Sequence, residues 1–308
     1  MRIDSSFDAV RRGAANVRAN WQTMVLHVGI NVSLFALTMG IFLAMRPLLD
    51  RVDANDLPRF ARAHPLLIAG VVIGAVALLV IFLVLQAWIV AGNAATFVAG
   101  ERADASPVFE WRAWLSAARA GMWRVIGVYL TIGALALLVF GIFAGVSMLA
   151  SQQGVVACCV MAVVMPIILI GMLLMTALTA KAIVLGAEEL LPARESLRLA
   201  WEEMSDRLSV HAGSLLLILV STGIASFAIS LLTLATTHLG SRVDSTFIFA
   251  PLELFMNLLQ QIVSAISTNW LFATMAAVTT LRPLPAPATV FIEPAADAAP
   301  EPDPEAQS

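Results

Sequence analysis

Residues 66–90 read LLIAGVVIGAVALLVIFLVLQAWIV, a run of 25 residues without a charged side chain. A membrane-spanning helix needs about 20 consecutive apolar residues, whereas the apolar run of a β-strand is only about 4–8 residues long. Five other runs are comparably long. The sequence therefore predicts an all-α integral membrane protein with six transmembrane helices, at about 24–45, 66–90, 125–150, 155–180, 212–234 and 254–278.

The composition agrees with this architecture. Of the 308 residues, 60% are hydrophobic and 13% are charged, whereas soluble domains carry about 25% charged residues. Such a chain cannot cover itself with a wetted surface, which excludes a soluble globular protein. No basic patch with interleaved aromatic residues occurs, so nucleic acid is excluded as a partner and membrane lipids are expected instead. The sequence identifies no protein partner. The Ala-, Pro- and acid-rich tail at 284–308 is expected to be disordered.

The distribution of Arg and Lys predicts the orientation. Thirteen of the eighteen basic residues fall in the N-terminal segment, the second and fourth loops and the C-terminal tail, and five fall in the other loops. Because cytoplasmic segments carry the excess of positive charge, both termini are expected in the cytoplasm. The first outer loop, with four Arg residues, runs against this trend.

Three charged segments, at about 5–22, 107–122 and 192–208, precede the first, third and fifth spans. Their apolar residues are spaced so that they share one helical face, which is typical of a helix lying in the membrane interface. These stripes are Val10, Ala14, Val17 and Trp21; Trp111, Leu115, Ala118 and Met122; and Leu197, Trp201, Met204 and Leu208. Pro107 and Pro192 are expected in the first turns of the second and third helices. The fold is thus predicted as three pairs of spans, each preceded by a cytoplasmic-side amphipathic helix.

Arg residues on the charged faces of these helices are predicted to contact lipid headgroups. They are Arg11, Arg12, Arg112, Arg119 and Arg198. An anionic membrane surface attracts such residues electrostatically.

The segment after the fourth span reads AIVLGAEE at 182–189 and ESLRLAW at 195–201. A short apolar run, an acidic residue, a gap and a helix carrying Ser resemble the six-span proteins related to the membrane domain of bacterial glycerophosphoryl diester phosphodiesterases, including the YciC-type proteins. The resemblance implies the six-span topology and a bacterial inner-membrane location. It does not imply phosphodiesterase activity, which in that family needs a separate barrel domain. Lys181 stands where such proteins often have Pro.

The sixth span carries the main candidate for a functional site, a set of polar residues at helical spacing. They are Glu253, Asn257, Gln260, Gln261, Ser264 and Thr268. One interpretation is a path for a polar solute or an ion through the membrane. The other is packing, in which amides and hydroxyls form hydrogen bonds between helices. The sequence leaves both open.

Patterns that would indicate an enzyme are missing. His27 and His211 lie at matching depth in separate spans, but no cluster has metal-ligand spacing, and no nucleophile motif occurs. We therefore expect no metal, no cofactor and no catalysis. The sequence favours a non-enzymatic inner-membrane protein acting in envelope or lipid organisation, with a small-solute or ion transporter or channel as the alternative.

Overall fold

The computed structural model describes residues 5–49, 60, 62–150, 155–240 and 246–279, and the regular structure within them is helical. Six helices are long and apolar enough to cross a membrane, which confirms the six expected spans. The elements in chain order are α1 (Ser6–Ala19), α2 (Trp21–Leu49), α4 (Pro65–Arg102), α5 (Trp111–Ala150), α6 (Val155–Glu189), α7 (Ala193–Asp206), α8 (Leu208–Gly240) and α9 (Thr246–Val278). The predicted tail at 284–308 lies outside the described residues.

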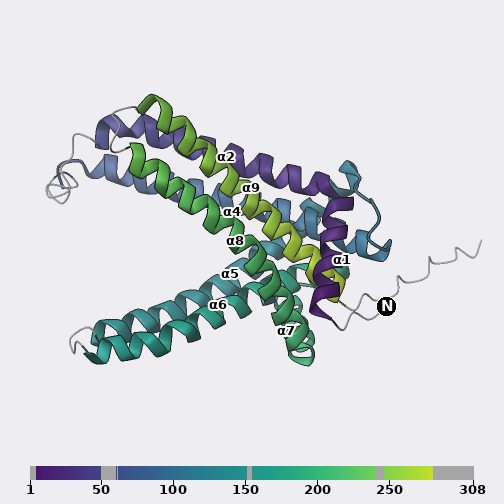
Figure 1. Ribbon diagram of the computed structural model, residues 1–308. Helices are drawn as coiled ribbons and strands as arrows, with labels where there is room; N and C mark the ends of the chain where they lie inside the picture. Colours follow the sequence, from purple (N-terminus) through teal and green to yellow (C-terminus); the bar gives the residue numbers. More distant parts are fainter. Residues whose placement is uncertain (1–4, 50–59, 61, 151–154, 241–245, 280–308) are drawn as a thin grey trace, which may run out of the picture.

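The helices form two arms that diverge from a common end (Figure 1). The first arm contains α2, α4, α8 and α9, and the second contains α5 and α6. We call the end where they meet α1 and α7 the closed end. In the described part of the second arm, side chains are buried only near this end, from Trp114 to Val128 and from Ala177 to Leu185. Helices α2, α4, α8 and α9 thus share one arm, and α5 and α6 diverge from them.

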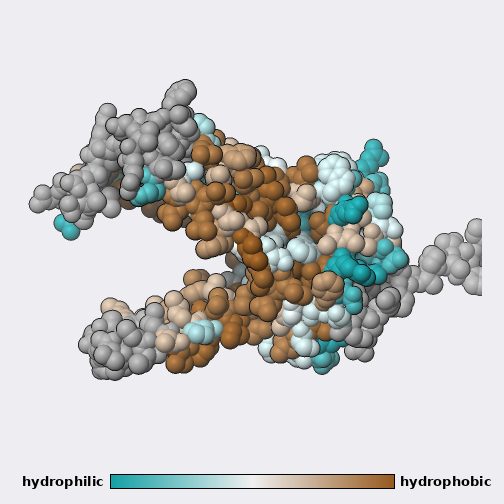
Figure 2. Space-filling model, in the orientation of Figure 1, coloured by the Kyte–Doolittle hydropathy of each residue, from teal (hydrophilic) through white to brown (hydrophobic). Residues whose placement is uncertain are grey.

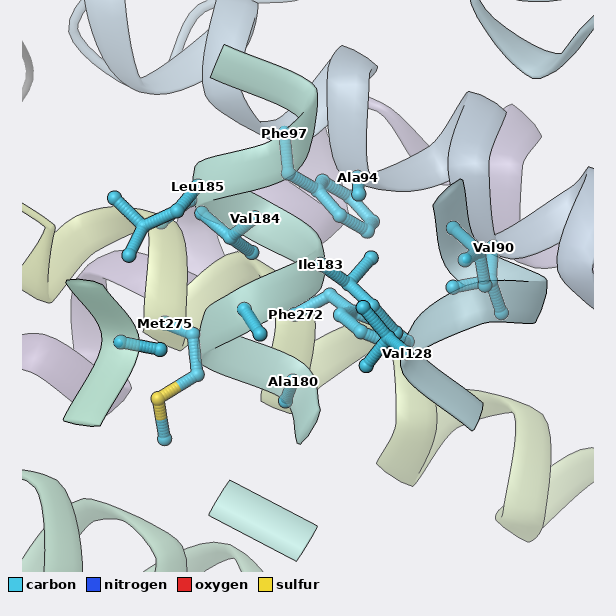
Figure 3. Packing of buried hydrophobic residues seen from close by; sticks show 14 of the residues in the cluster. Val90, Ala94, Phe97, Val128, Ala180, Ile183, Val184, Leu185, Phe272 and Met275 are labelled. Carbon is cyan, nitrogen blue, oxygen red and sulfur yellow. The ribbon is translucent and has the colours of Figure 1, made fainter. Parts of the chain in front are cut away.

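The apolar core lies at the closed end, where α4, α5, α6 and α9 meet (Figure 3). Phe97, Ile183 and Phe272 are among its large side chains, and alanines such as Ala94 and Ala180 lie between them. Small residues let helix backbones approach closely, which is the main source of packing energy between helices in a bilayer. The core therefore positions the closed ends of the spans and leaves their other ends free to diverge.

Helix α1 packs against the closed ends of α4, α8 and α9. Its buried residues are Ala9, Val10, Gly13 and Asn16, a face rotated from the predicted stripe. Gly13 faces Thr274 of α9 so closely that a Cβ atom there would lie 2.8 Å from the Thr274 Cα atom. Only a small side chain permits this approach, so the face of α1 that carries Gly13 meets the protein. Trp21 of the predicted stripe, at the start of α2, is instead 53% exposed.

The same rotation occurs in α7, which begins directly after Pro192 and corresponds to the predicted helix at 192–208. Its buried residues are Ser196, Ala200 and Met204, whereas Trp201 of the predicted stripe is 58% exposed. The small residues Ser196 and Ala200 face the protein together with Met204, which belongs to the predicted stripe, and Trp201 faces outward.

The helix predicted separately at 107–122 is wrong as a distinct element, because α5 runs unbroken for 40 residues from Trp111. No Pro interrupts residues 111–150. Pro107 precedes the helix instead of starting it. The Asn20 Oδ1 atom accepts hydrogen bonds from the backbone N–H groups of Val108 (2.9 Å) and Phe109 (3.1 Å), which holds this segment apart from the helix. At 1.5 Å per residue, α5 is about 60 Å long, roughly twice the hydrocarbon thickness.

The sixth candidate span, by length and composition, is Leu254–Val278. The helix that contains it starts earlier, at Thr246, so Pro251 neither breaks nor starts it. Near the beginning of a helix, Pro removes only one backbone hydrogen bond, to the carbonyl four residues earlier. This loss is small beside the many bonds that follow.

Ion pairs join the elements of the closed end. The Lys181 side chain is fully buried, and its Nζ atom lies 2.7 Å from both Glu203 Oε2 and Thr279 Oγ1. These contacts link α6 to α7 and to the residue that follows α9. A buried charge is tolerated only when it is paired in this way. Lys181, expected only as one of the cytoplasmic positive charges, is therefore a structural link.

Replacing Glu203 by Ala would leave the buried Lys181 without its carboxylate. We expect Glu203→Ala to lower stability by roughly 3 kcal/mol, seen as a lower midpoint of thermal unfolding of the detergent-purified protein. Glu202→Ala is the matched control, because Glu202 is more exposed and lies 3.7 Å from Arg198. Equal effects of the two substitutions would contradict a structural role for the Lys181–Glu203 pair.

Candidate functional site

A partly open cavity of about 590 Å³ lies between α2, α4 and α9 in the first arm. Its apolar wall includes Leu34, Phe35, Phe82 and Leu83, and Tyr129 of α5 also lines it. Its other polar lining residues include His27, Asn31, Gln86, Gln261, Ser264 and Thr268. Among the described residues, none that lines the cavity is an acid or a base except the titratable His27, so this lining is amphipathic and close to neutral.

Two buried amides, Asn93 of α4 and Asn269 of α9, connect this cavity to α5. The indole Nε1–H of Trp114 donates to Asn93 Oδ1 (2.9 Å), and Asn93 Nδ2 donates to Asn269 Oδ1 (2.8 Å). Asn269 Nδ2 in turn donates to the Nδ1 atom of His27, 3.1 Å away. Four helices are thus joined through one chain of hydrogen bonds, which we call the amide chain.

The direction of the amide chain is fixed at its start, because an indole N–H donates and never accepts. Asn93 must present its oxygen to Trp114 and its nitrogen to Asn269. The remaining amide hydrogens agree, since Asn93 donates to the Thr23 carbonyl (3.3 Å) and Asn269 to the Ala265 carbonyl (2.8 Å). His27 therefore accepts at Nδ1, and in the neutral ring its proton is on Nε2.

The chain continues from His27 to the cavity wall. Gln86 is the second side-chain partner of His27. The Nε2 atom of Gln86 donates to Asn31 Oδ1, one helical turn beyond His27 on α2. The Gln86–Asn31 bond itself thus assigns the donor role to the amide nitrogen of Gln86 and the acceptor role to the oxygen of Asn31.

The predicted polar face of α9 is divided between two cavities. Gln261, Ser264 and Thr268 line the cavity described above. Asn257 and Gln260 line a different cavity of about 360 Å³ on the side of α8, beside Ser230 and Thr233. Glu253 belongs to α9, but its side chain lies outside the described part of the structure.

These cavities do not form one continuous polar path to the closed end. Toward that end, α9 is buried from Phe272 to Val278 in the core. Ser267 donates to the Thr222 hydroxyl of α8 (3.2 Å), a packing contact of the kind that the alternative interpretation describes.

The predicted headgroup-contacting Arg residues occupy two kinds of position. Arg11, Arg112, Arg119 and Arg198 are exposed. Arg12 is partly buried, pairs with Glu101 of α4 and places its Nη2 atom 2.9 Å from Asp104. Arg12 is thus engaged within the protein, where it ties α1 to the end of α4.

His27 and His211 belong to different sets of hydrogen bonds. His27 is bound into the amide chain, whereas the Nδ1 atom of His211 lies 3.0 Å from the Arg207 carbonyl near the Lys181 pair. No group of three or more His, Cys, Asp or Glu side chains with the geometry of a metal site occurs among the described residues.

Sequence reasoning missed Asn93 and Asn269, the two residues on which the cavity depends. Asn269 lies within an apolar span, and Asn93 follows one directly. A polar amide in such an apolar run needs a hydrogen-bond partner on another helix, so its presence in the sequence indicates a contact between helices. The partner is not readable from the sequence, because 176 residues separate the two.

Family models, curated proteins and solved structures were compared with the chain, and none of the three comparisons finds a match.

The Trp114 indole and Gly92 are tightly matched. A Cβ atom on Gly92 would lie 2.5 Å from Trp114 Cε2, so only Gly lets the indole reach Asn93. We expect Trp114→Phe, which removes the donor and leaves a buried acceptor unsatisfied, to cost about 1–3 kcal/mol of stability. Thermal unfolding of the purified protein measures this loss.

Trp111→Phe is the matched control for that substitution. Trp111 stacks on Trp114 with ring centroids 5.3 Å apart, but it is 49% exposed. Loss of stability in both variants alike would show that the Trp114 ring matters for its area and not for its hydrogen bond.

Proposed function

We propose that this chain is a non-enzymatic, multi-pass protein of the bacterial inner membrane that holds phospholipid between its two arms and so organises the surrounding lipids. The observation that carries the proposal is the apolar surface on both sides of the space between the arms (Figure 2). In water, two such surfaces would close on each other. In a bilayer no such force acts, because acyl chains are as apolar as the side chains.

The junction of the arms supports this proposal in detail. A cavity of about 250 Å³ lies there between α6 and α8, and its lining consists of apolar side chains and one glycine. Leu173 of α6 and Leu216 of α8 face it from opposite sides. Its chemistry suits an acyl chain, which needs contact with apolar groups and no hydrogen bonds.

Residues at the closed end support an interfacial, cytoplasmic position for α1 and α7. Trp21, Trp111 and Trp201 are all about half exposed there, and the surface of this end is the most hydrophilic part of the view in Figure 2. Trp at headgroup depth, together with exposed Arg, is typical of the cytoplasmic membrane interface. The resemblance to the six-span phosphodiesterase membrane-domain group supports the inner-membrane location, and the distribution of Arg and Lys supports the cytoplasmic orientation.

Native mass spectrometry of the protein in mild detergent tests the lipid proposal. We expect the wild type to retain phospholipid and Leu216→Trp, which fills the junction cavity, to lose it several-fold. Leu137→Trp is the matched control, because Leu137 is 74% exposed and lines none of the cavities described above. Wild-type protein that is free of lipid, or equal retention by both variants, would contradict the proposal.

A small-solute or ion transporter is the second candidate. Two cavities with polar lining, of about 590 and 360 Å³, flank the polar face of α9, which favours this reading. The buried end of α9 would have to move to connect them with the closed end.

Flux across proteoliposomes tests this candidate. A transporter or channel should dissipate an imposed proton or potassium gradient, and Gln261→Leu should slow the flux. Ser226→Ala on α8 is the control, because Ser226 lines neither cavity. Gradients that persist as in protein-free liposomes would eliminate the candidate for these ions.

A further inference from the structure

We infer that the cavity between α2, α4 and α9 binds an uncharged amphipathic molecule through a carbonyl oxygen. Four observations support this site: the fixed direction of the amide chain, the donors that end it, the near-neutral lining, and the apolar wall. The site shares no lining residue with the junction cavity between α6 and α8, so the inference goes beyond the proposed lipid function.

The amide chain makes the cavity wall on α2 and α4 a donor surface. Trp114 sets the direction, and each amide after it accepts with its oxygen and donates with its nitrogen. At the end of the chain, Asn31 uses its oxygen to accept from Gln86. Within the described part of the chain, the Asn31 amide nitrogen has no protein partner. Its two hydrogens are therefore available to a ligand in the cavity, and one hydrogen of Gln86 also remains.

On the opposite wall, the hydroxyl of Thr268 can accept a hydrogen bond from a ligand but cannot donate one. The hydroxyl of Thr268 donates to the Ser264 carbonyl at 2.9 Å, so its proton is already used. Thr268 therefore contributes no donor to a ligand, whereas Gln261 of α9, Ser264 of α9 and Tyr129 of α5 also line the cavity and carry donor groups beside those of Asn31 and Gln86.

The lining limits the rest of the ligand. Among the described residues, no Arg, Lys, Asp or Glu lines the cavity, so a phosphate or ammonium group would be desolvated there without a counter-charge from these residues, at a cost of several kcal/mol. Leu34, Phe35, Phe82 and Leu83 provide an apolar wall. An uncharged head with a carbonyl and an apolar ring or chain fits both conditions. An isoprenoid quinone and the acyl ester of a neutral glycerolipid share this chemistry.

Two probes separate these sources. Purified protein in nanodiscs is titrated with a decyl-substituted benzoquinone and with dioctanoylglycerol, and calorimetry measures binding. Binding of the quinone alone assigns the site to quinones, and binding of the diester alone or of both assigns it to acyl-ester or general carbonyl ligands. Each result supports the inference. Decanol, which lacks a carbonyl, is the control ligand and is expected to bind much more weakly.

Substitutions test the donors. Asn31→Leu and Gln86→Met each remove donors with little change in volume, and we expect each to weaken binding of the active probe at least several-fold. Thr268→Val is the matched control on the opposite wall and should bind like the wild type. Monodisperse elution confirms folding of each variant, and the two donor variants provide independent tests.

The direction of hydrogen bonding in the amide chain can be tested at the His27 ring nitrogens. In protein with ¹⁵N-labelled histidine, the wild-type His27 ring should show a protonated Nε2 and an unprotonated Nδ1. Trp114→Phe, which does not line the cavity, should weaken probe binding and broaden or shift these resonances.

Binding of neither probe, wild-type affinity in both donor variants, or equal binding of decanol would overturn the inference. Wild-type protein that retains phospholipid at the junction and yet binds neither probe would overturn this inference alone. The reverse result would overturn only the proposed lipid function.

Discussion

A polar side chain inside a bilayer has no water to bond with, and this constraint determines how the helices of this protein meet. Apolar side chains gain little by exchanging lipid for protein, so they only weakly select one helix as a neighbour over another. Polar side chains select strongly, because an unpaired amide or ammonium group is costly. Asn93, Asn269 and His27 bring α2, α4 and α9 together, while Lys181 joins α6 to α7. Each cluster pairs residues far apart in the chain, and both lie in the part of the molecule where the arms meet.

The spans were predictable because length and apolarity alone define them. Residues 66–90 and Leu254–Val278 are examples, and both fall within long apolar helices of the structure. The arrangement of the spans in two arms was not predictable, since lipid-facing and protein-facing apolar residues look alike in a sequence. For the candidate site, the predicted residues Gln261, Ser264 and Thr268 do line the cavity. The side chains that organise it, Asn93 and Trp114, belong to other helices, and only three-dimensional contact reveals them.

The short helices α1 and α7 show why a hydrophobic stripe misleads near a membrane. In a soluble protein, the largest apolar residues mark the face that meets the core. Here the faces that meet the protein carry Gly13 and Asn16 in α1 and Ser196 and Ala200 in α7, and Trp201 points away. Small residues permit close backbone contact, which the large Trp side chain does not. The pattern predicted helices in these segments but not which face would be buried.

The second arm is attached to the rest of the molecule at one end only, which makes it a lever. Its helices are buried near Trp114–Val128 and Ala177–Leu185, and α5 extends about 20 residues beyond the last of its buried side chains, a length of roughly 30 Å. Over this length, a tilt of about 10° at the junction displaces the far tip by about 5 Å. The separation of the two arms at their diverging ends is consequently governed by a few side chains near the closed end.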